Sequence, residues 1–221
     1  IGVDKTKANA YTKKVGKWME ENGGKFDGIV YSIDFHPNGH CSFFEQYPGC
    51  VPTKHCDACT CKGRPGEDKI VWPTHCVQET SGAYLHADIP YFTNRPSLDD
   101  LVTNDRSYPV MEKVRMIKNH AQKKYDNNDG KTIWLFKGLQ QDVDSYSAFL
   151  GNDGKTETGL DAALKEKFGS PSNINLWVLG IAYEVCVANT IKDGLAKGYQ
   201  VKFLPDLSAS VLDNAGLTIS C

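Results

Sequence analysis

The segment INLWVLGIAYEVC, residues 174–186, contains the change of pattern that decides the fold. Its apolar run at 174–180 predicts a buried strand, and the pattern at Glu184–Lys197 predicts the helix that follows. Gly198 ends that helix, and Tyr199–Leu204 predicts another strand. A strand, a helix and a second strand in succession indicate a parallel sheet, because parallel strands need a crossover connection between them.

The same alternation extends toward the N-terminus. The remaining elements are predicted from apolar spacing: helices at 8–21, Met111–Tyr125 and Gly159–Phe168, and strands at Phe26–Ile33 and Thr132–Phe136. Between Asp34 and about Arg95 no period is sustained, which predicts a long irregular region. We therefore expect an α/β fold: three αβα layers around a doubly wound, mainly parallel sheet, in one domain over residues 1–221.

Composition excludes several classes of protein. The 221 residues are 40% hydrophobic and 24% charged, which is typical of globular domains and not of disordered, collagen-like or coiled-coil chains. A net charge of −2 argues against nucleic acid or an anionic membrane as a partner. The longest apolar stretch, Leu176–Tyr183, is far shorter than the roughly 18 residues that a membrane span needs.

Six of the eight cysteines lie between Cys41 and Cys76, mostly in a stretch that we call the Cys-rich insertion, about residues 41–70. One interpretation is structural zinc, bound by His55, Cys56, Cys59 and Cys61 together with Cys50. The other is a set of disulfides among Cys41, Cys50, Cys56, Cys59 and Cys61, with Cys221 completing an even number. A second Cys-x-x-Cys at zinc-module spacing is missing, which favours disulfides and, with them, a secreted or extracellular protein over a cytoplasmic one.

Chemically active side chains follow three of the predicted strands. Asp34 and His36 follow the first strand, Lys137 follows 132–136, and Cys186 lies in the first turn of the helix after 174–180. Because the carboxyl ends of parallel strands meet at one edge, these groups are expected to lie together. The helix N-terminus favours the thiolate of Cys186, and Lys137 is placed to stabilise it. The alternatives are a packing cysteine and a solvated lysine at the rim of the sheet.

Asp34-x-His36 also has the composition of part of a metal shell, which His40 or His75 would complete. Imidazole nitrogen and carboxylate oxygen suit zinc and similar ions. Turn chemistry alone often places such residues together, so a plain loop is the alternative interpretation of this pair.

Five segments, in order along the chain, resemble the isochorismatase-like cysteine hydrolases and, within them, the nicotinamidases. They are SIDFHPNGHCSF (32–43), VWPTHCV (71–77), FKG (136–138), DSYSAF (144–149) and LGIAYEVCV (179–187). The resemblance implies a metal-dependent amidohydrolase that converts nicotinamide to nicotinate and ammonia through a cysteine thioester. It also implies a small-molecule substrate and, since relatives often self-associate, a homo-oligomer.

The resemblance assigns roles to individual residues. Cys186 is similar to the nucleophile and Lys137 to the lysine beside it, while the backbone N–H groups of Ala182 and Cys186 would form an oxyanion hole after a cis Ile181–Ala182 peptide bond. The remaining assignments are the metal ligands Asp34, His36 and His75, with His40 as an additional ligand or a support, and the pocket residues Trp72, Tyr146 and Ile181. One divalent ion is implied, with zinc favoured over iron or manganese.

One part of the family pattern is missing from this sequence. The third member of the family's triad is an aspartate in a Val-Asp-x-Gln-x-Asp-Phe segment on the first, central strand, expected before Ile1 and apparently absent from the given chain. Asp4 is a poor substitute, because the context around it does not match. The alternative function is therefore a catalytically impaired, Cys-rich secreted homologue that uses the fold for binding or assembly. A third interpretation is a hydrolase of another small amide.

Overall fold

The computed structural model of the chain describes residues 5–66, 69–83, 85–90, 101–102 and 132–211. Three features named above lie outside these residues: the predicted helix Met111–Tyr125, Asp4 and Cys221. The longer elements are α1 (Lys5–Asn22), β1 (Ile29–Asp34), β2 (Leu101–Val102), β3 (Thr132–Lys137), α3 (Leu160–Phe168), β4 (Asn175–Ile181), α4 (Ala188–Ala196) and β5 (Gln200–Ala209). Short helical turns are η1 (Gly23–Lys25), η2 (Phe44–Gln46), η3 (Ser81–Ala83), η5 (Pro171–Asn173) and the π-helical turn η6 (Tyr183–Val187).

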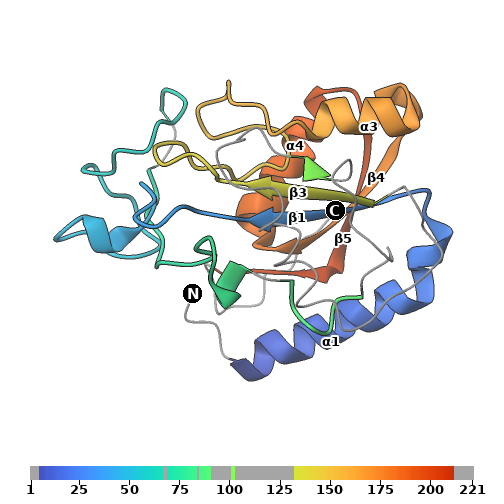
Figure 1. Cartoon of the computed structure of the whole chain (residues 1–221), viewed down its shortest axis with the longest axis horizontal. Helices are drawn as coiled ribbons and strands as arrows, with labels where there is room; N and C mark the ends of the chain where they lie inside the picture. The colour runs from blue at the N-terminus through green and yellow to red at the C-terminus, as the bar shows by residue number, and fades with distance from the viewer. Residues whose placement is uncertain (1–4, 67–68, 84, 91–100, 103–131, 212–221) are drawn as a thin grey trace.

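The predicted α/β class with parallel strands is confirmed. All described strand pairs are parallel, and α1 lies on one side of the strands while α3 and α4 lie on the other (Figure 1). The prediction of one continuous sheet differs from the described strands, which form two sheets in the orders β1-β3-β2 and β4-β5. β3 is paired along both of its edges, so within the described residues it has no free edge for β4.

Strand β3 forms the centre of the core because it is buried on both faces. Trp134 and Phe136 point to the side of α1, where Met19 packs against their cluster. Ile133 and Leu135 point to the other side and pack with side chains of α3. This alternation explains why β3 is a continuous apolar run: a strand with period two that is buried on both sides has no polar face.

Leu176 of β4 and Val201 of β5 pack against the same apolar cluster as Ile133 and Leu135. The two sheets therefore share one core although no described backbone hydrogen bond joins them. At roughly 1.5–3 kcal/mol for each fully buried large apolar side chain, this cluster is a major source of stability.

The Cys-rich insertion lies beyond the carboxyl ends of β1 and β3, at the left of Figure 1. Its two ends are hydrogen-bonded to each other: the Trp72 N–H donates to the Ser42 carbonyl at 2.7 Å, and the Phe44 N–H donates to the Trp72 carbonyl at 2.9 Å. Disulfides join Cys41 to Cys61 and Cys50 to Cys56.

The expectation of disulfides is confirmed for these four cysteines, and Cys59 is a buried free thiol. The groups of described residues with metal-ligand spacing contain no cysteine, and three of the candidate zinc ligands, Cys50, Cys56 and Cys61, are consumed in the two bonds. Across the described part of the chain, no helix combines the length and the apolar character that crossing a membrane requires.

Candidate active site

The register of β1 and β3 brings two halves of the site together. Asp34 and Lys137 are the last residues of these strands and are direct partners in the parallel ladder. The ladder continues for one more step, since the Phe35 N–H donates to the Lys137 carbonyl at 2.9 Å. The strand ends therefore hold the Asp34 carboxylate and the Lys137 ammonium group together at one edge of the sheet, as the sequence predicts.

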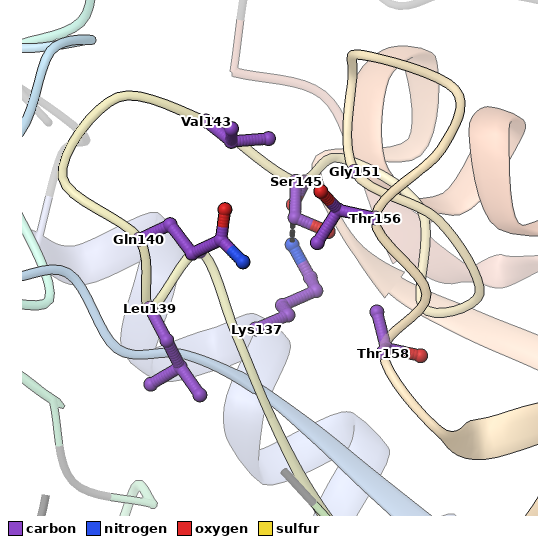
Figure 2. Close-up of a pocket in the computed structure, with 9 residues that line it drawn as sticks. Lys137, Leu139, Gln140, Val143, Ser145, Gly151, Thr156 and Thr158 are labelled. Carbon is purple, nitrogen blue, oxygen red and sulfur yellow. Dashed lines mark hydrogen bonds between the residues drawn. The ribbon is translucent and has the colours of Figure 1, made fainter. Parts of the chain in front are cut away.

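Lys137 is buried and its ammonium group faces three acceptors. It forms an ion pair with Asp34, donates to the Ser145 carbonyl at 2.6 Å (Figure 2) and lies 3.6 Å from the Cys186 sulfur. Burial alone would lower the pKa of Lys137, but the negative charges of Asp34 and Cys186 outweigh it, and the pKa lies above its usual value. The lysine is therefore a fixed positive charge beside the thiol.

Cys186 lies in the π-helical turn η6, before α4 begins at Ala188. The backbone N–H groups of Val185 and Val187 both donate to the Ala182 carbonyl at 3.1 Å. The sequence predicted a thiolate favoured by an α-helical first turn, and the structure differs. Burial raises the pKa of Cys186 to about 11, although Lys137 and the Ala182 N–H act in the opposite direction. The resting group is a thiol, and reaction requires that its proton be removed.

The peptide bond between Ile181 and Ala182 is cis, as the family resemblance implies. Ala182 is buried and packs with Trp72 and Val185, against which Cys186 also lies. The backbone at Ala182, one of the two expected oxyanion donors, thus lies close to the Cys186 sulfur.

Asp34, His36 and His75 form the first group with metal-ligand spacing, with one ligand atom of each within 4.8 Å of the others. Nδ1 of His36 is 3.0 Å from the Gly138 carbonyl, and Nδ1 of His75 is 2.7 Å from the Pro73 carbonyl. A carbonyl only accepts, so each Nδ1 carries the proton and each Nε2 presents a lone pair.

The electrostatics of this group suit a cation. Burial lowers the pKa of His36 to about 4, which keeps its imidazole neutral, the form that binds metals. Burial would raise the pKa of Asp34, but Lys137, His36 and His75 together lower it to about 2. The donor set of two imidazoles and one carboxylate matches a divalent ion such as zinc.

His40 belongs to a second group of this spacing, with His36 and Asp144. Its ring lies 4.3 Å from that of His36 between centroids, but both of its nitrogens face protein partners. Nδ1 is 2.8 Å from the Ser42 hydroxyl and Nε2 is 3.4 Å from the Val143 carbonyl. His40 therefore packs against His36 with both of its nitrogens directed at protein partners, and its role toward the metal stays a prediction.

Two aromatic residues flank the thiol. The indole N–H of Trp72 donates to the Tyr146 hydroxyl at 3.1 Å, and the rings meet edge to face at 6.1 Å. Tyr146 and Cys186 both pack against the cluster that contains Trp72. Ile181, the third predicted pocket residue, is 45% exposed and is not part of this cluster, because β4 turns its side chain outward.

A small cavity lies next to Lys137, with Gln140, Ser145, Thr156 and Thr158 in its wall (Figure 2). It offers about 10 Å³ to the centre of a water-sized molecule, which is roughly the space of a single water. This space is too small for an aromatic amide, so the substrate ring would not bind in this cavity.

The sequence did not reveal two hydrogen bonds that main-chain carbonyl groups accept in the site. The Ser145 carbonyl orients Lys137, and main-chain contacts of this kind leave no residue-type signal. Cys76 accepts the His36 N–H through its carbonyl at 2.9 Å and so joins the two metal-ligand loops. Burial, followed by Asp34, raises the pKa of the Cys76 thiol to about 12, so this thiol is protonated at neutral pH.

Comparison with known proteins finds nicotinamidases that are similar to this chain in sequence. No family model matches. A nicotinamidase from Acinetobacter baylyi is 29% identical over 199 residues, covering 90% of this chain and 71% of that protein. A nicotinamidase from Escherichia coli is 28% identical over 86% of this chain, and the match spans 65% of that protein.

Solved structures agree with these relatives. An Acinetobacter nicotinamidase/pyrazinamidase matches with a TM-score of 0.63 and 26% identity over 92% of this chain and 75% of that one. The Leishmania infantum protein solved with nicotinate matches with a TM-score of 0.57 and 25% identity over 93% and 70%. A Pyrococcus horikoshii pyrazinamidase solved with zinc shares the fold, with a TM-score of 0.54 and 22% identity over 91% and 73%.

Proposed function

We propose that this chain, which resembles nicotinamidases in sequence and in fold, hydrolyses nicotinamide to nicotinate and ammonia. The observation that carries the proposal is the 3.6 Å approach of the buried Lys137 ammonium to the Cys186 sulfur, beside a group with metal-ligand spacing. A binding protein has no need for a nucleophile held against a buried cation, so this arrangement favours catalysis over the non-catalytic alternative.

Cys186 attacks the carboxamide carbon of nicotinamide through its sulfur. The S–C bond forms, the thiol proton ends on the departing nitrogen, and the C–N bond breaks to release ammonia and leave a thioester. Water then adds to the thioester, which regenerates the thiol and releases nicotinate. Lys137 stabilises the sulfur while it is anionic, and the backbone N–H groups of Ala182 and Cys186 receive the charge that develops on the carbonyl oxygen.

Asp34, His36 and His75 would hold one divalent ion, and their two imidazoles and one carboxylate favour zinc over manganese, which prefers oxygen ligands. When bound, the ion supplies a Lewis acid toward the pyridine nitrogen of the substrate. Trp72 and Tyr146 would hold the ring, and their mutual hydrogen bond fixes both planes before substrate arrives.

The two disulfides support our further proposal that the protein works in an oxidising compartment, as a secreted or extracellular protein. Self-association into a homo-oligomer remains a prediction from the resemblance. Sedimentation of the purified protein measures it.

The test of the proposed function is ammonia release from nicotinamide by the purified, zinc-loaded protein. Cys186→Ala is expected to abolish turnover, because it removes the only atom that forms the covalent intermediate. Cys59→Ala is the matched control: it removes another buried free thiol, in the Cys-rich insertion, and should leave turnover unchanged. Equal ammonia release by Cys186→Ala and by the unmodified protein would overturn the mechanism.

A further inference from the structure

Gly138 follows Lys137 at the end of β3, in a backbone conformation that favours glycine. Its φ is +66°, in the left-handed region that residues with a side chain rarely adopt. Gly138 is also in close contact with the imidazole of His36. A Cβ added at position 138 would lie 2.4 Å from Cε1 and 2.6 Å from Nδ1 of that ring, closer than real Cβ atoms approach.

The ring of His36 has no room to yield to such a Cβ. His36 is 2% exposed, and three rings surround it: His40 at 4.3 Å, His75 at 4.9 Å and Phe43 at 5.7 Å between centroids. Two of these neighbours belong to the groups with metal-ligand spacing, so a displaced His36 would also displace them. The contact with Gly138 therefore defines where the His36 ring can lie.

The carbonyl of Gly138 has a second effect on the same ring. It accepts the Nδ1 proton of His36 at 3.0 Å, which leaves Nε2 as the ligand atom. The residue is held in place from the strand side, because the carbonyl of the preceding Lys137 accepts the Phe35 N–H at 2.9 Å.

We propose that Gly138 is a positioning residue for the divalent ion: its bare α-carbon admits the His36 imidazole, and its carbonyl turns Nε2 toward the ion. This inference rests on the metal-binding part of the proposed function. It also connects the two halves of the site, because the same dipeptide supplies the cation beside Cys186 and the seat of a metal ligand.

The experiment measures zinc affinity of the purified protein by competition with a chromophoric chelator, without nicotinamide. Gly138→Ala is expected to weaken zinc binding by about 10-fold or more, the usual cost of disturbing a partner of a metal ligand. Gly169→Ala is the matched control: Gly169 has a φ of +87° but no atom within 4 Å of its added Cβ, so it carries the same backbone cost without the contact. Its zinc affinity should stay within about twofold of the unmodified value.

A double variant tests whether the effect passes through His36. In a His36→Ala background, Gly138→Ala should cause no further loss of zinc affinity, because the ring it displaces is gone. Equal zinc affinity of Gly138→Ala and the unmodified protein, an equal loss in Gly169→Ala, or an additive loss in the His36→Ala background each overturns the inference.

Folding and activity are read separately. If Gly138→Ala alone does not fold, circular dichroism of the double variant decides: recovered folding supports the contact with His36, and continued failure overturns it. A protein that binds zinc but releases no ammonia contradicts the proposed function and leaves this inference standing. A protein that binds no zinc overturns this inference.

Discussion

The site is built from two regions that are held together in different ways. The ends of β1 and β3 are fixed by a parallel ladder and by a core that buries β3 on both faces. The Cys-rich insertion has no long helix or strand among its described residues and is closed by two disulfides and a pair of backbone hydrogen bonds at its base. The strand ends carry Lys137 and Asp34, and the base of the insertion carries Trp72.

The two regions therefore have different roles: the strand ends supply the reacting and charged groups, and the base of the insertion supplies a residue that would bind the substrate. The parallel ladder and the buried core around β3, which form whenever this sheet folds, position the charged groups of Asp34 and Lys137. The insertion, whose two disulfides depend on redox conditions, is joined by backbone hydrogen bonds to Trp72, the wall against which the substrate ring would lie. Changes at the strand ends should therefore affect the chemical step and folding together, while changes in the insertion should affect substrate binding and folding and leave the chemical step intact.

The largest effect is expected from Lys137→Met. It removes the charge beside Cys186, and kcat/KM should fall by about 100-fold or more. It also leaves Asp34 without its buried partner, which costs on the order of 3 kcal/mol of unfolding free energy. Lys197→Met is the control: that lysine pairs with Glu157 and Asp161 away from the site, and its loss should cost less than about 1 kcal/mol and leave activity intact. Ammonia release and urea denaturation measure both, and an equal response of the two variants contradicts this assignment.

A smaller effect is expected from opening the disulfides. The Cys41–Cys61 bond closes 20 residues and the Cys50–Cys56 bond closes 6, so loop entropy predicts losses of about 3 and about 2 kcal/mol in the respective double serine variants. Only the first bond includes Cys41, which lies between His40 and the Ser42 carbonyl that accepts from Trp72, so only its loss should raise KM for nicotinamide. Thermal unfolding and steady-state kinetics test the pair, and a KM that is unchanged in both variants would show that the insertion does not shape the pocket.

The effect of pH is expected only above pH 9. Burial raises the pKa of Cys186 to about 11, while the same thiol in the unfolded chain titrates near the ordinary value of 9.0. Below pH 9 the thiol is protonated in both states, and its contribution to stability is complete. Between pH 9 and 11 only the unfolded thiol ionises, so the unfolding free energy should fall by about 2–3 kcal/mol more than in Cys186→Ser. Parallel pH profiles of the two proteins would contradict the buried, neutral thiol.

Much of this arrangement follows from the sequence, and the physical reasons are specific. The apolar run before Lys137 and the crossover pattern around residues 174–204 predict parallel strands, and parallel strands bring Asp34, Lys137 and Cys186 to one edge. The spacing of apolar residues along the sequence indicates which positions are buried and whether they repeat as in a helix or a strand, which is why the positions of these elements are predicted closely.

Other features depend on contacts between distant segments. The division of the described strands into two sheets reflects which edge of β3 is occupied, and no local pattern encodes that. The choice of Cys61 as the partner of Cys41, the outward direction of Ile181 and the raised pKa of Cys186 depend in the same way on packing across the fold. The residue types predict which side chains belong to the site, and tertiary packing decides their pairing, their direction and their pKa.

The hydrogen bonds between Ser42, Phe44 and Trp72 have a consequence for the design of variants. These bonds join the two ends of the insertion, but Lys62 and Arg64 also donate their backbone N–H groups to the carbonyls of Asp142 and Asn152 at 2.8 and 3.0 Å, so the insertion is anchored to the fold at a second place. A short β-turn in place of residues 45–70 would remove that second anchor together with the loop. Foreign peptides are better grafted at an exposed position inside the insertion, such as Val51, which is 57% exposed.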